Sequence, residues 1–216
     1  MAFPDRKIEV PVDDLFGLSL WAAVPVALVS TISHDDHPDL APMTLVWFAA
    51  YTDMAERAPC TKTIAVGMGD YTSVEVLRKK RTYRNIVDTE EFVVNVPSVD
   101  IVEQTNATVF FNEDKFAATG LTPQPSLRVR PPSVAECKLS YECRLNRIED
   151  LGNMTEVFWG DIVAVRADPE LLAVEGEARV RALNPIYHYL HRREHGSYFA
   201  LGESVYEEPD RGVPEP

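Results

Sequence analysis

The most constraining feature of this chain is a series of short apolar runs rich in β-branched and aromatic residues. Such runs, bounded by polar or proline-containing segments, are typical of β-strands. The connections between them do not follow the regular strand–helix alternation of a parallel sheet. We therefore predict a mainly β fold, a six-stranded antiparallel barrel with peripheral α-helices. The predicted strands are Pro25–Ser33, Met43–Thr52, Thr63–Gly67, Phe92–Val96, Glu136–Leu145 and Thr155–Arg166.

Three details of this pattern are open to structural test. Segment 33–42 is polar and holds two prolines, which favours a loop. Apolar and polar residues alternate over 136–145, which places Cys137 and Cys143 on one strand face. Six residues of extended chain separate their Cα atoms by about 20 Å, so a disulfide between them is excluded. Gly160 interrupts the last run and marks a bulge or a close approach.

Helical spacing and capping residues predict short helices between and after the strands. The predicted helices are residues 71–80, a helix capped by Thr82, one beginning at Ser98, residues 114–119 stopped by Gly120, and a last helix from Asn184 as N-cap to Gly196.

The charge balance limits the partners of the protein. Lys and Arg number 21 against 34 Asp and Glu, which gives a formal net charge of −13. Proteins that bind nucleic acids or anionic membranes generally need surplus cations, so we expect neither partner. With no secretory leader, no membrane span and an odd cysteine count, we expect a reduced cytoplasmic protein. We assign residues 1–206 to one domain and residues 207–216 to an acidic, proline-rich tail.

One cationic segment stands out against this acidic background. Five Lys or Arg residues lie between Arg78 and Arg84, at the predicted start of a helix. The first N–H groups of a helix and the positive end of its dipole attract anions, and Lys80 and Arg81 add full charges. We therefore interpret this segment as a phosphate-binding site that includes Thr82. A solvated helical surface is the alternative interpretation of the same residues.

A second candidate is the segment Asp39–Thr44, which combines small residues and a proline ahead of a strand. Small residues let the backbone pass close to a flat ligand, and Thr44 adds a hydroxyl group beside main-chain amides. The plain start of a strand is the alternative.

Histidines and nucleophiles carry weaker signals. His188, His191 and His195 have i, i+3 and i+7 spacing and would share one face of the predicted last helix. No second ligand segment accompanies them, so we predict no metal site. The sequence has no nucleophile elbow, P-loop or dinucleotide-binding glycine motif, and we name no catalytic residue.

Taken together, the segments resemble the flavin reductase-like family with the FMN-binding split barrel, which includes the flavoredoxins. The resemblance extends from about Pro25 to Tyr198, through VPVALVSTISHDDHPDLAPMT, KKRTYRNIVDTEEFVVNVPS, EQTNAT, FAATGLTPQPSLRVRPPSVAECKLSYECRL, LGNMTEVFWGDIVAV and HGSYFALG. It implies a homodimer of six-stranded Greek-key barrels with FMN at the dimer interface.

The resemblance also implies which residues hold the cofactor. The first strand and the segment after it would line the flavin, and the cationic segment would hold the phosphate. The implied FMN-binding residues are Ser30, Thr31, Asp39, Leu40, Ala41, Pro42, Thr44, Lys80, Arg81, Thr82, Asn85 and Tyr198. Two positions depart from the family pattern, because Asp39 replaces the usual Asn and Arg81 the usual Asp. Asp39 brings a negative charge toward the flavin, and Arg81 strengthens the phosphate side.

The function implied is that of an NAD(P)H-dependent flavin oxidoreductase. Hydride would pass from NADH or NADPH to FMN, and the reduced flavin would serve an acceptor or a partner monooxygenase. Two alternatives stay open. One is a non-enzymatic, flavoredoxin-type FMN electron carrier, and the other is a split barrel that has lost flavin and does other chemistry in the same pocket.

Overall fold

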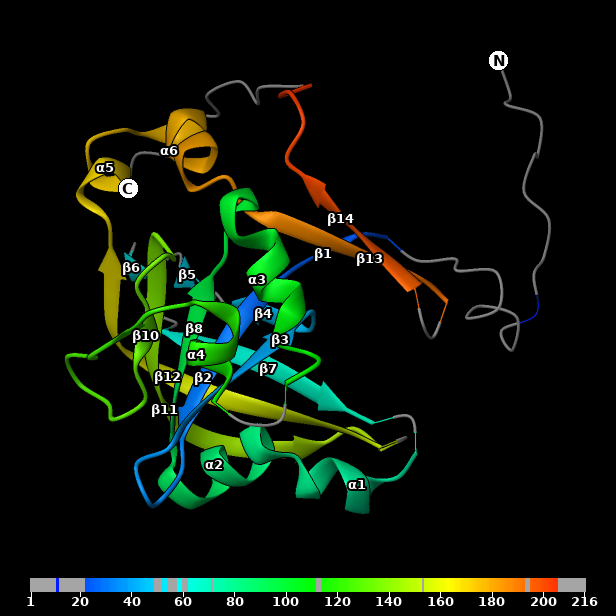
Figure 1. Ribbon diagram of the computed structural model, residues 1–216. Helices are drawn as coiled ribbons and strands as arrows, with labels where there is room; N and C mark the ends of the chain where they lie inside the picture. The colour runs from blue at the N-terminus through cyan, green and yellow to red at the C-terminus, as the bar shows by residue number, and fades with distance from the viewer. Residues whose placement is uncertain are drawn as a thin grey trace.

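A curled antiparallel sheet forms the centre of the computed structural model, which describes residues 11, 22–48, 52–53, 58–59, 62–70, 72–111, 114–152, 154–192 and 195–205. Within the described residues the sheet has seven strands in the order β3-β2-β8-β11-β12-β7-β4 (Figure 1). The strands are β2 (Ala27–Ile32), β3 (Pro38–Met43), β4 (Val46–Phe48), β7 (Thr63–Gly69), β8 (Glu91–Val96), β11 (Leu139–Asp150) and β12 (Thr155–Ala167).

The two edge strands of this sheet are consecutive in the chain, which explains the strand count. β3 pairs with β2, β4 pairs with β7, and only Thr44 and Leu45 separate β3 from β4. β3 and β4 are therefore two halves of one interrupted strand, of which the prediction contained only the part from Met43 onward, and the other five strands overlap predicted ones. The connection from β7 to β8 joins strands that are not neighbours, as in a Greek key. The predicted mainly β fold with peripheral helices is confirmed.

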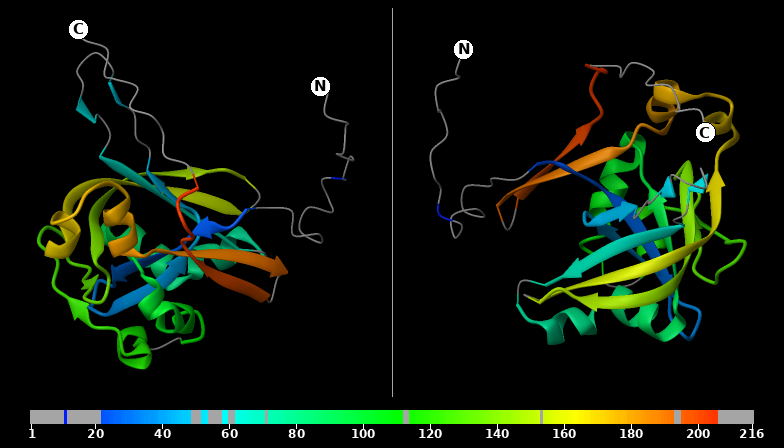
Figure 2. Two further views of the ribbon diagram at one scale, coloured as in Figure 1. Left: turned by 90° about the horizontal axis from the view of Figure 1, so that it is seen from above. Right: turned by 180° about the vertical axis from the view of Figure 1, so that it is seen from behind.

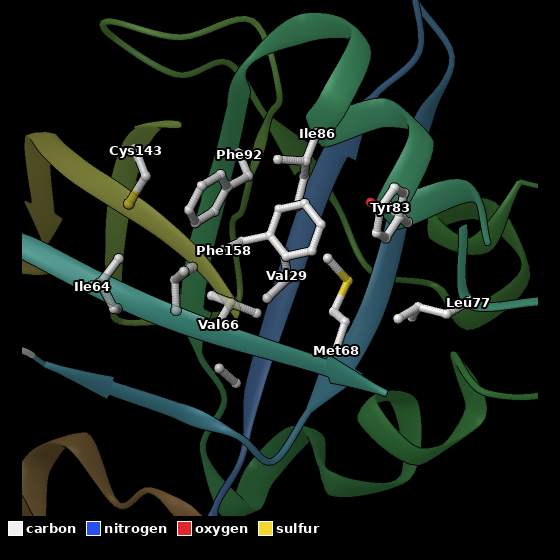
Figure 3. Close-up of a cluster of buried hydrophobic side chains, with 12 residues drawn as sticks. Val29, Ile64, Val66, Met68, Leu77, Tyr83, Ile86, Phe92, Cys143 and Phe158 are labelled. Atoms are coloured by element: carbon white, nitrogen blue, oxygen red, sulfur yellow. The ribbon is translucent and has the colours of Figure 1, made fainter. Parts of the chain in front are cut away.

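The barrel encloses one cluster of buried side chains that converge from several strands and from the helical residues Leu77, Tyr83 and Ile86 (Figure 3). Phe92 and Phe158 are fully buried there, and the ring of Tyr83 meets Phe158 edge-on with 5.0 Å between centroids. Gly160 makes room for this packing, since a Cβ atom at that position would lie 2.3 Å from Cζ of Phe92. A register shift lies opposite Gly160, between Leu145 and Arg147. The predicted close approach at Gly160 is confirmed, whereas the extra residue of the bulge, Asn146, lies on β11 opposite it.

Helices lie at both ends of the barrel (Figures 1 and 2). At one end are α1 (Val74–Lys79) and α2 (Arg81–Thr89), and toward the other are α5 (Pro169–Leu172) and α6 (Gly176–Leu183). A second apolar cluster packs beside β2 and β3, under η2 (Val99–Ile101), α3 (Val102–Ala107) and α4 (Lys115–Thr119). It contains Leu28, Leu40, Ile101, Phe116, Leu121, Val134 and Cys137. Among the described residues, the helices are too short or too polar to cross a membrane.

Three small antiparallel sheets complete the described structure. β1 (Val24–Pro25), β13 (Ile186–Arg192) and β14 (His195–Ala200) form a three-stranded sheet beside the barrel (Figure 2). The two remaining pairs are β9 (Pro123–Gln124) with β10 (Ser133–Val134), and β5 (Thr52–Asp53) with β6 (Ala58–Pro59). The predicted tail at residues 207–216 lies outside the described residues, so this boundary stays a prediction.

The predicted helix over residues 184–196 is wrong. Asn184 does not begin a helix, because it ends α6 in the left-handed conformation with φ of 48°. Asn suits both helix ends, as an N-cap and as a left-handed residue, so its presence alone did not settle the direction. Tyr187 and Tyr189 favour strands, and both pair with residues of β14. Helices α5 and α6 were not predicted.

Two strand predictions also need correction. Residues 38–42 belong to β3 and not to a loop. Their prolines are tolerated because β3 lies at the edge of the hydrogen-bonded order, where fewer N–H donors are required. The predicted run Met43–Thr52 is interrupted at Thr44 and Leu45, and residues 49–51 lie outside the described part of the chain.

The two described cysteines are free thiols, as predicted, but they do not share a face. Cys137 precedes β11 and belongs to the second apolar cluster, whereas Cys143 belongs to the barrel core. A register shift between Glu142 and Cys143 breaks the strict alternation, and Ser140 and Glu142 are buried as well. Glu142 is buried because its carboxylate accepts the N–H groups of the loop residues Leu127 and Arg128.

Candidate functional site

A junction of one residue connects α1 to α2. Lys80 ends the first helix and precedes the second with extended backbone, at φ −62° and ψ 139°. The first N–H groups of α2 have no partners within the helix, by the geometry of any α-helix. Among the described residues no side chain caps this helix from the N-cap position, and its first turn holds no acidic residue. The start of α2 is therefore electropositive. The prediction that Thr82 caps this helix is wrong, because Lys80 is the N-cap and Thr82 is the second residue of the helix.

The hydroxyl group of Thr82 is used in a contact with β3. Oγ1 of Thr82 donates to Oδ2 of Asp39 at 3.3 Å. Oδ1 of Asp39 lies 3.3 Å from the Arg81 guanidinium and 3.2 Å from Nζ of Lys115. The Asp39 side chain is only 3% exposed, and Oδ1 receives no well-directed hydrogen bond from the described residues. The two cations therefore act on this oxygen as ion pairs.

Lys115 is the residue of this cluster that the sequence did not reveal. It lies in the first turn of α4, and Nζ also donates to the carbonyl oxygen of Leu40 at 2.6 Å. Burial lowers the pKa of Lys115, and the neighbouring Asp39 opposes that effect. Lys115 thereby ties α4 to β3 at the position where β3 faces α2. No spacing or motif in the sequence indicated this contact.

Two other cations of the predicted phosphate-binding segment are paired with different carboxylates. Arg78 lies 2.5 Å from Oε1 of Glu156, and Lys80 lies 2.9 Å from Oδ2 of Asp70. The Lys80 hydrogen bond lowers the pKa of Asp70 to about 2. The cations that meet Asp39 are Arg81 and Lys115, which leaves this cluster with one net positive charge.

Three polar candidates lie behind the cluster and bind one another or the barrel. Nδ2 of Asn85 donates to Oγ1 of Thr31 at 3.0 Å, and both residues are buried. This bond ties α2 to β2, and Thr31 pairs with Asp39 across the β2–β3 ladder. Oγ of Ser30 donates to the carbonyl oxygen of Pro132 at 2.5 Å and accepts from Asn95. The hydroxyl of Ser30 therefore binds on the face of the sheet that carries the second apolar cluster, opposite the barrel core.

The other β3 candidates differ in exposure. Leu40 is fully buried, its backbone included, in the second apolar cluster, and its carbonyl oxygen accepts from Lys115. Ala41, Pro42 and Thr44 are half-buried, and Thr44 lies at the interruption between β3 and β4. The structure thus brings Asp39, Arg81 and Thr82 into direct contact and places the small residues of β3 next along the chain.

Tyr198 lies on β14, in a different sheet. Its hydroxyl donates to Oδ1 of Asn106 at 3.1 Å, and its ring packs on His188 with 5.0 Å between centroids. These contacts connect it to α3 and β13 and not to α2. Because residues 186–192 form a strand, the proposed helical face of three histidines does not exist, and His188 faces Tyr198 instead. In the described part of the chain, no three His, Cys, Asp or Glu side chains come together in a way that could hold a metal ion.

Comparison with known sequences now places this arrangement. The sequence profile of the flavin reductase like domain matches residues 21–193, which include every candidate residue except Tyr198. The chain belongs to the flavin reductase-like family. Within it, an uncharacterized protein of Aquifex aeolicus (strain VF5) is 31% identical over 169 residues, which cover 76% of this chain and 80% of the relative.

Solved structures of other proteins share the fold. Nitrilotriacetate monooxygenase component B from Bacillus cereus superposes with a TM-score of 0.73 at 23% identity, over 96% of this chain and 98% of that one. Flavoredoxin of Desulfovibrio vulgaris (Miyazaki F) superposes with a TM-score of 0.67 at 26% identity, over 87% of this chain and 92% of that one. The split-barrel fold expected for this flavin reductase-like protein is confirmed.

Proposed function

We propose that this protein is an FMN-binding flavin oxidoreductase that uses NADH or NADPH. The proposal is supported by membership of the flavin reductase-like family. The structural observation that carries it is the electropositive start of α2, where Arg81, Thr82 and Lys115 surround a buried Asp39 carboxylate. Bound FMN would supply the hydride and electron transfer, so the protein would need no acid–base pair of its own.

The charges around the start of α2 fit a phosphate group. Arg81 and Lys115 outweigh Asp39 by one positive charge, and the first N–H groups of the helix favour an anion. Asp39 itself would repel a phosphate, and Lys115 offsets that repulsion. The residues that we propose for the phosphate side are Lys80, Arg81, Thr82 and Asn85.

β2 and β3 lie side by side. Ser30 pairs with Leu40 and Thr31 with Asp39 in the ladder, and all four residues are buried. The accessible part of β3 begins with the half-buried Ala41 and Pro42, so the flavin ring would lie there, and Thr44 would contribute its hydroxyl. The residues that we propose for the ring side are Ser30, Thr31, Asp39, Leu40, Ala41, Pro42, Thr44 and Tyr198.

The visible spectrum of the purified protein is the first test. We expect it to retain FMN or to take it up when FMN is added, and to oxidise NADH or NADPH. A protein that shows neither flavin absorbance nor turnover with added FMN would contradict the proposal. In that case a split barrel that has lost flavin becomes the better account.

A flavoredoxin-type electron carrier is the second candidate, and the similarity to Desulfovibrio flavoredoxin at 26% identity favours it. Such a carrier would receive electrons from a protein donor and not from free nicotinamide. Stopped-flow mixing of the FMN-loaded protein with NADH and with NADPH separates the two functions. Fast bleaching of the flavin supports the oxidoreductase, and reduction by a strong chemical reductant alone supports the carrier.

We also propose a homodimer, supported by exposed apolar side chains on β4 and β12. Trp47 is 41% exposed, Phe48 51% and Val165 54%. Phe48 and Val165 both adjoin Tyr141 of β11, so part of this surface is continuous. A second copy of the chain would remove it from water. Light scattering tests the proposal, and a monomeric mass at all concentrations would contradict it.

A partner monooxygenase is proposed as the consumer of reduced flavin. The support is the similarity to the Bacillus cereus protein, which is named as a component of nitrilotriacetate monooxygenase.

A further inference from the structure

A second buried carboxylate, that of Glu156, binds the chain on both sides of the junction between α1 and α2. Glu156 lies on β12, and its side chain is 2% exposed. Oε1 accepts from Nε of Arg78 at 3.0 Å and from a terminal nitrogen of the same guanidinium at 2.5 Å. Oε2 accepts from the hydroxyl of Tyr83 at 2.6 Å. Arg78 belongs to the last turn of α1 and Tyr83 to the first turn of α2, so one carboxylate holds both helix ends.

This clamp matters because the junction itself consists of Lys80 alone. A single residue contributes two soft backbone dihedral angles, and small changes in them would swing the start of α2. The ring of Tyr83 is fixed against Phe158, two residues along the same strand as Glu156. A buried tyrosine hydroxyl requires a hydrogen-bond partner, and Glu156 supplies it. Strand β12 thus sets both the depth and the direction of the first turn of α2.

We propose that Glu156 is a positioning residue for the anion-binding start of α2. The inference rests on the proposed function, because it assigns Glu156 to the phosphate side of the FMN site. Thr82 adjoins the clamped Tyr83, so the clamp fixes where the Thr82 hydroxyl and the first N–H groups point. Displacement of binding groups by about 1 Å is enough to lower the effectiveness of a site severely.

Charge and geometry predict opposite effects here, which makes the proposal testable. Glu156 carries a negative charge near a proposed anion site, so a purely electrostatic role predicts tighter FMN binding after its removal. A positioning role predicts weaker binding. Glu156→Gln removes the charge but keeps an acceptor for Arg78 and a partner for the Tyr83 hydroxyl, whereas Glu156→Ala removes both contacts.

The experiment compares FMN affinities by quenching of flavin fluorescence. We expect Glu156→Ala to weaken FMN binding about tenfold and Glu156→Gln to stay within about twofold of the wild type. Leu171→Ala is the matched control, because Leu171 is buried in α5 at the other end of the barrel. It should lower the thermal stability and leave FMN affinity unchanged. Should Glu156→Ala fail to fold, Tyr83→Phe and Arg78→Met each remove one arm of the clamp and should weaken binding about threefold.

A second measurement, hydrogen exchange, tests the positioning role of Glu156 independently of the proposed FMN-binding function. Without FMN, the amide groups of residues 84–87, which begin with the hydrogen bond from Arg84 N to the Lys80 carbonyl oxygen, should exchange hydrogen faster in Glu156→Ala than in the wild type. If the wild type takes up no FMN, the proposed function fails, and exchange alone then decides the role of Glu156. Three results would each overturn the positioning role. The first is unchanged hydrogen exchange in Glu156→Ala, and the second is an FMN affinity of Glu156→Ala equal to or above that of the wild type. The third is a loss of FMN affinity in Leu171→Ala equal to that in Glu156→Ala.

Discussion

The start of α2 lies between two buried carboxylates whose partners differ in kind. Glu156 is met by Arg78 and Tyr83 through hydrogen bonds at 2.5 to 3.0 Å, so both of its oxygens are satisfied. Asp39 receives one hydrogen bond from Thr82 at 3.3 Å, and its other oxygen has only ion-pair neighbours. Both oxygens of Glu156 are hydrogen-bonded within the protein, whereas Oδ1 of Asp39 can still accept a hydrogen bond.

This difference distinguishes a carboxylate that stabilises the fold from one that can take part in ligand binding. A saturated buried carboxylate fixes the elements around it and has little left to offer a ligand. A carboxylate whose partners are cations at longer distances sets a local charge that a ligand can change. We therefore expect substitutions at Glu156 to act through geometry, and substitutions around Asp39 to act through charge.

The largest effect should come from Lys115→Met. It removes a buried partner of Asp39 and leaves the carboxylate with Arg81, which is partly exposed. Breaking a buried ion pair on one side costs about 3 kcal/mol in the free energy of unfolding. The double variant Asp39→Asn with Lys115→Met should recover most of that loss in urea denaturation. A double variant as unstable as Lys115→Met would show that the lysine acts by packing alone.

Asp39→Asn should strengthen FMN binding about tenfold, or about 1.4 kcal/mol, because it raises the local charge from one to two positive units. The amide oxygen can still accept the hydrogen bond of Thr82. Calorimetric titration with FMN measures the change, and Glu156→Gln provides the matched loss of one buried carboxylate. Equal effects of the two substitutions would remove the distinction between charge and geometry.

Thr82→Ala should weaken FMN binding about fivefold, or about 1 kcal/mol, since it deletes the hydroxyl that adjoins the helix start. Thr82→Ser keeps the hydroxyl and should bind as the wild type does. Fluorescence titration of the wild type, Thr82→Ala and Thr82→Ser with FMN measures the three affinities. Unchanged affinity in Thr82→Ala would place the phosphate elsewhere.

The smallest predicted effect is a pH dependence of stability that arises from Tyr83, the hydrogen-bond partner of Glu156. Burial, followed by the hydrogen bond to Glu156, raises the pKa of Tyr83 above its usual 10.0. The unfolded chain then ionises first, so the contribution of Tyr83 to stability is complete below pH 10 and declines as the pH rises beyond it. The difference in the free energy of unfolding between the wild type and Tyr83→Phe should narrow above about pH 10, by less than about 1 kcal/mol. A constant difference would contradict the assignment.

Much of the barrel was predictable from the sequence because its strands carry local patterns. The runs around Val29, Val66 and Val94 place apolar residues where the core requires them, and Gly160 marks its own close contact. The hairpin at residues 186–200 was not predicted, because Asn184 suits either end of a helix and the spacing of Ile186, Tyr189 and Leu190 also fits a helix. The local pattern of this segment is compatible with both structures, and the tyrosines favour the strand only weakly.

The candidate site divides in the same way. Asp39, Arg81 and Thr82 were linked through family resemblance, and the structure brings them into contact. Lys115 and Glu156 were missed, since their partners are 75 and 73 or more residues away in the chain. The sequence around Lys115 is typical of an ordinary helix, and that around Glu156 of an ordinary strand. Only the folded structure shows that the charges of these two residues are buried and paired.

The single residue between α1 and α2 also constrains the length of the chain. Each residue added to an α-helix turns its face by about 100° and lengthens it by about 1.5 Å. One inserted or deleted residue at Lys80 would move either Arg78 or Tyr83 out of reach of Glu156, or turn Thr82 away from Asp39. The number of residues from Leu77 to Ile86 is therefore fixed by the site, and a change of length there should be harder to tolerate than most substitutions.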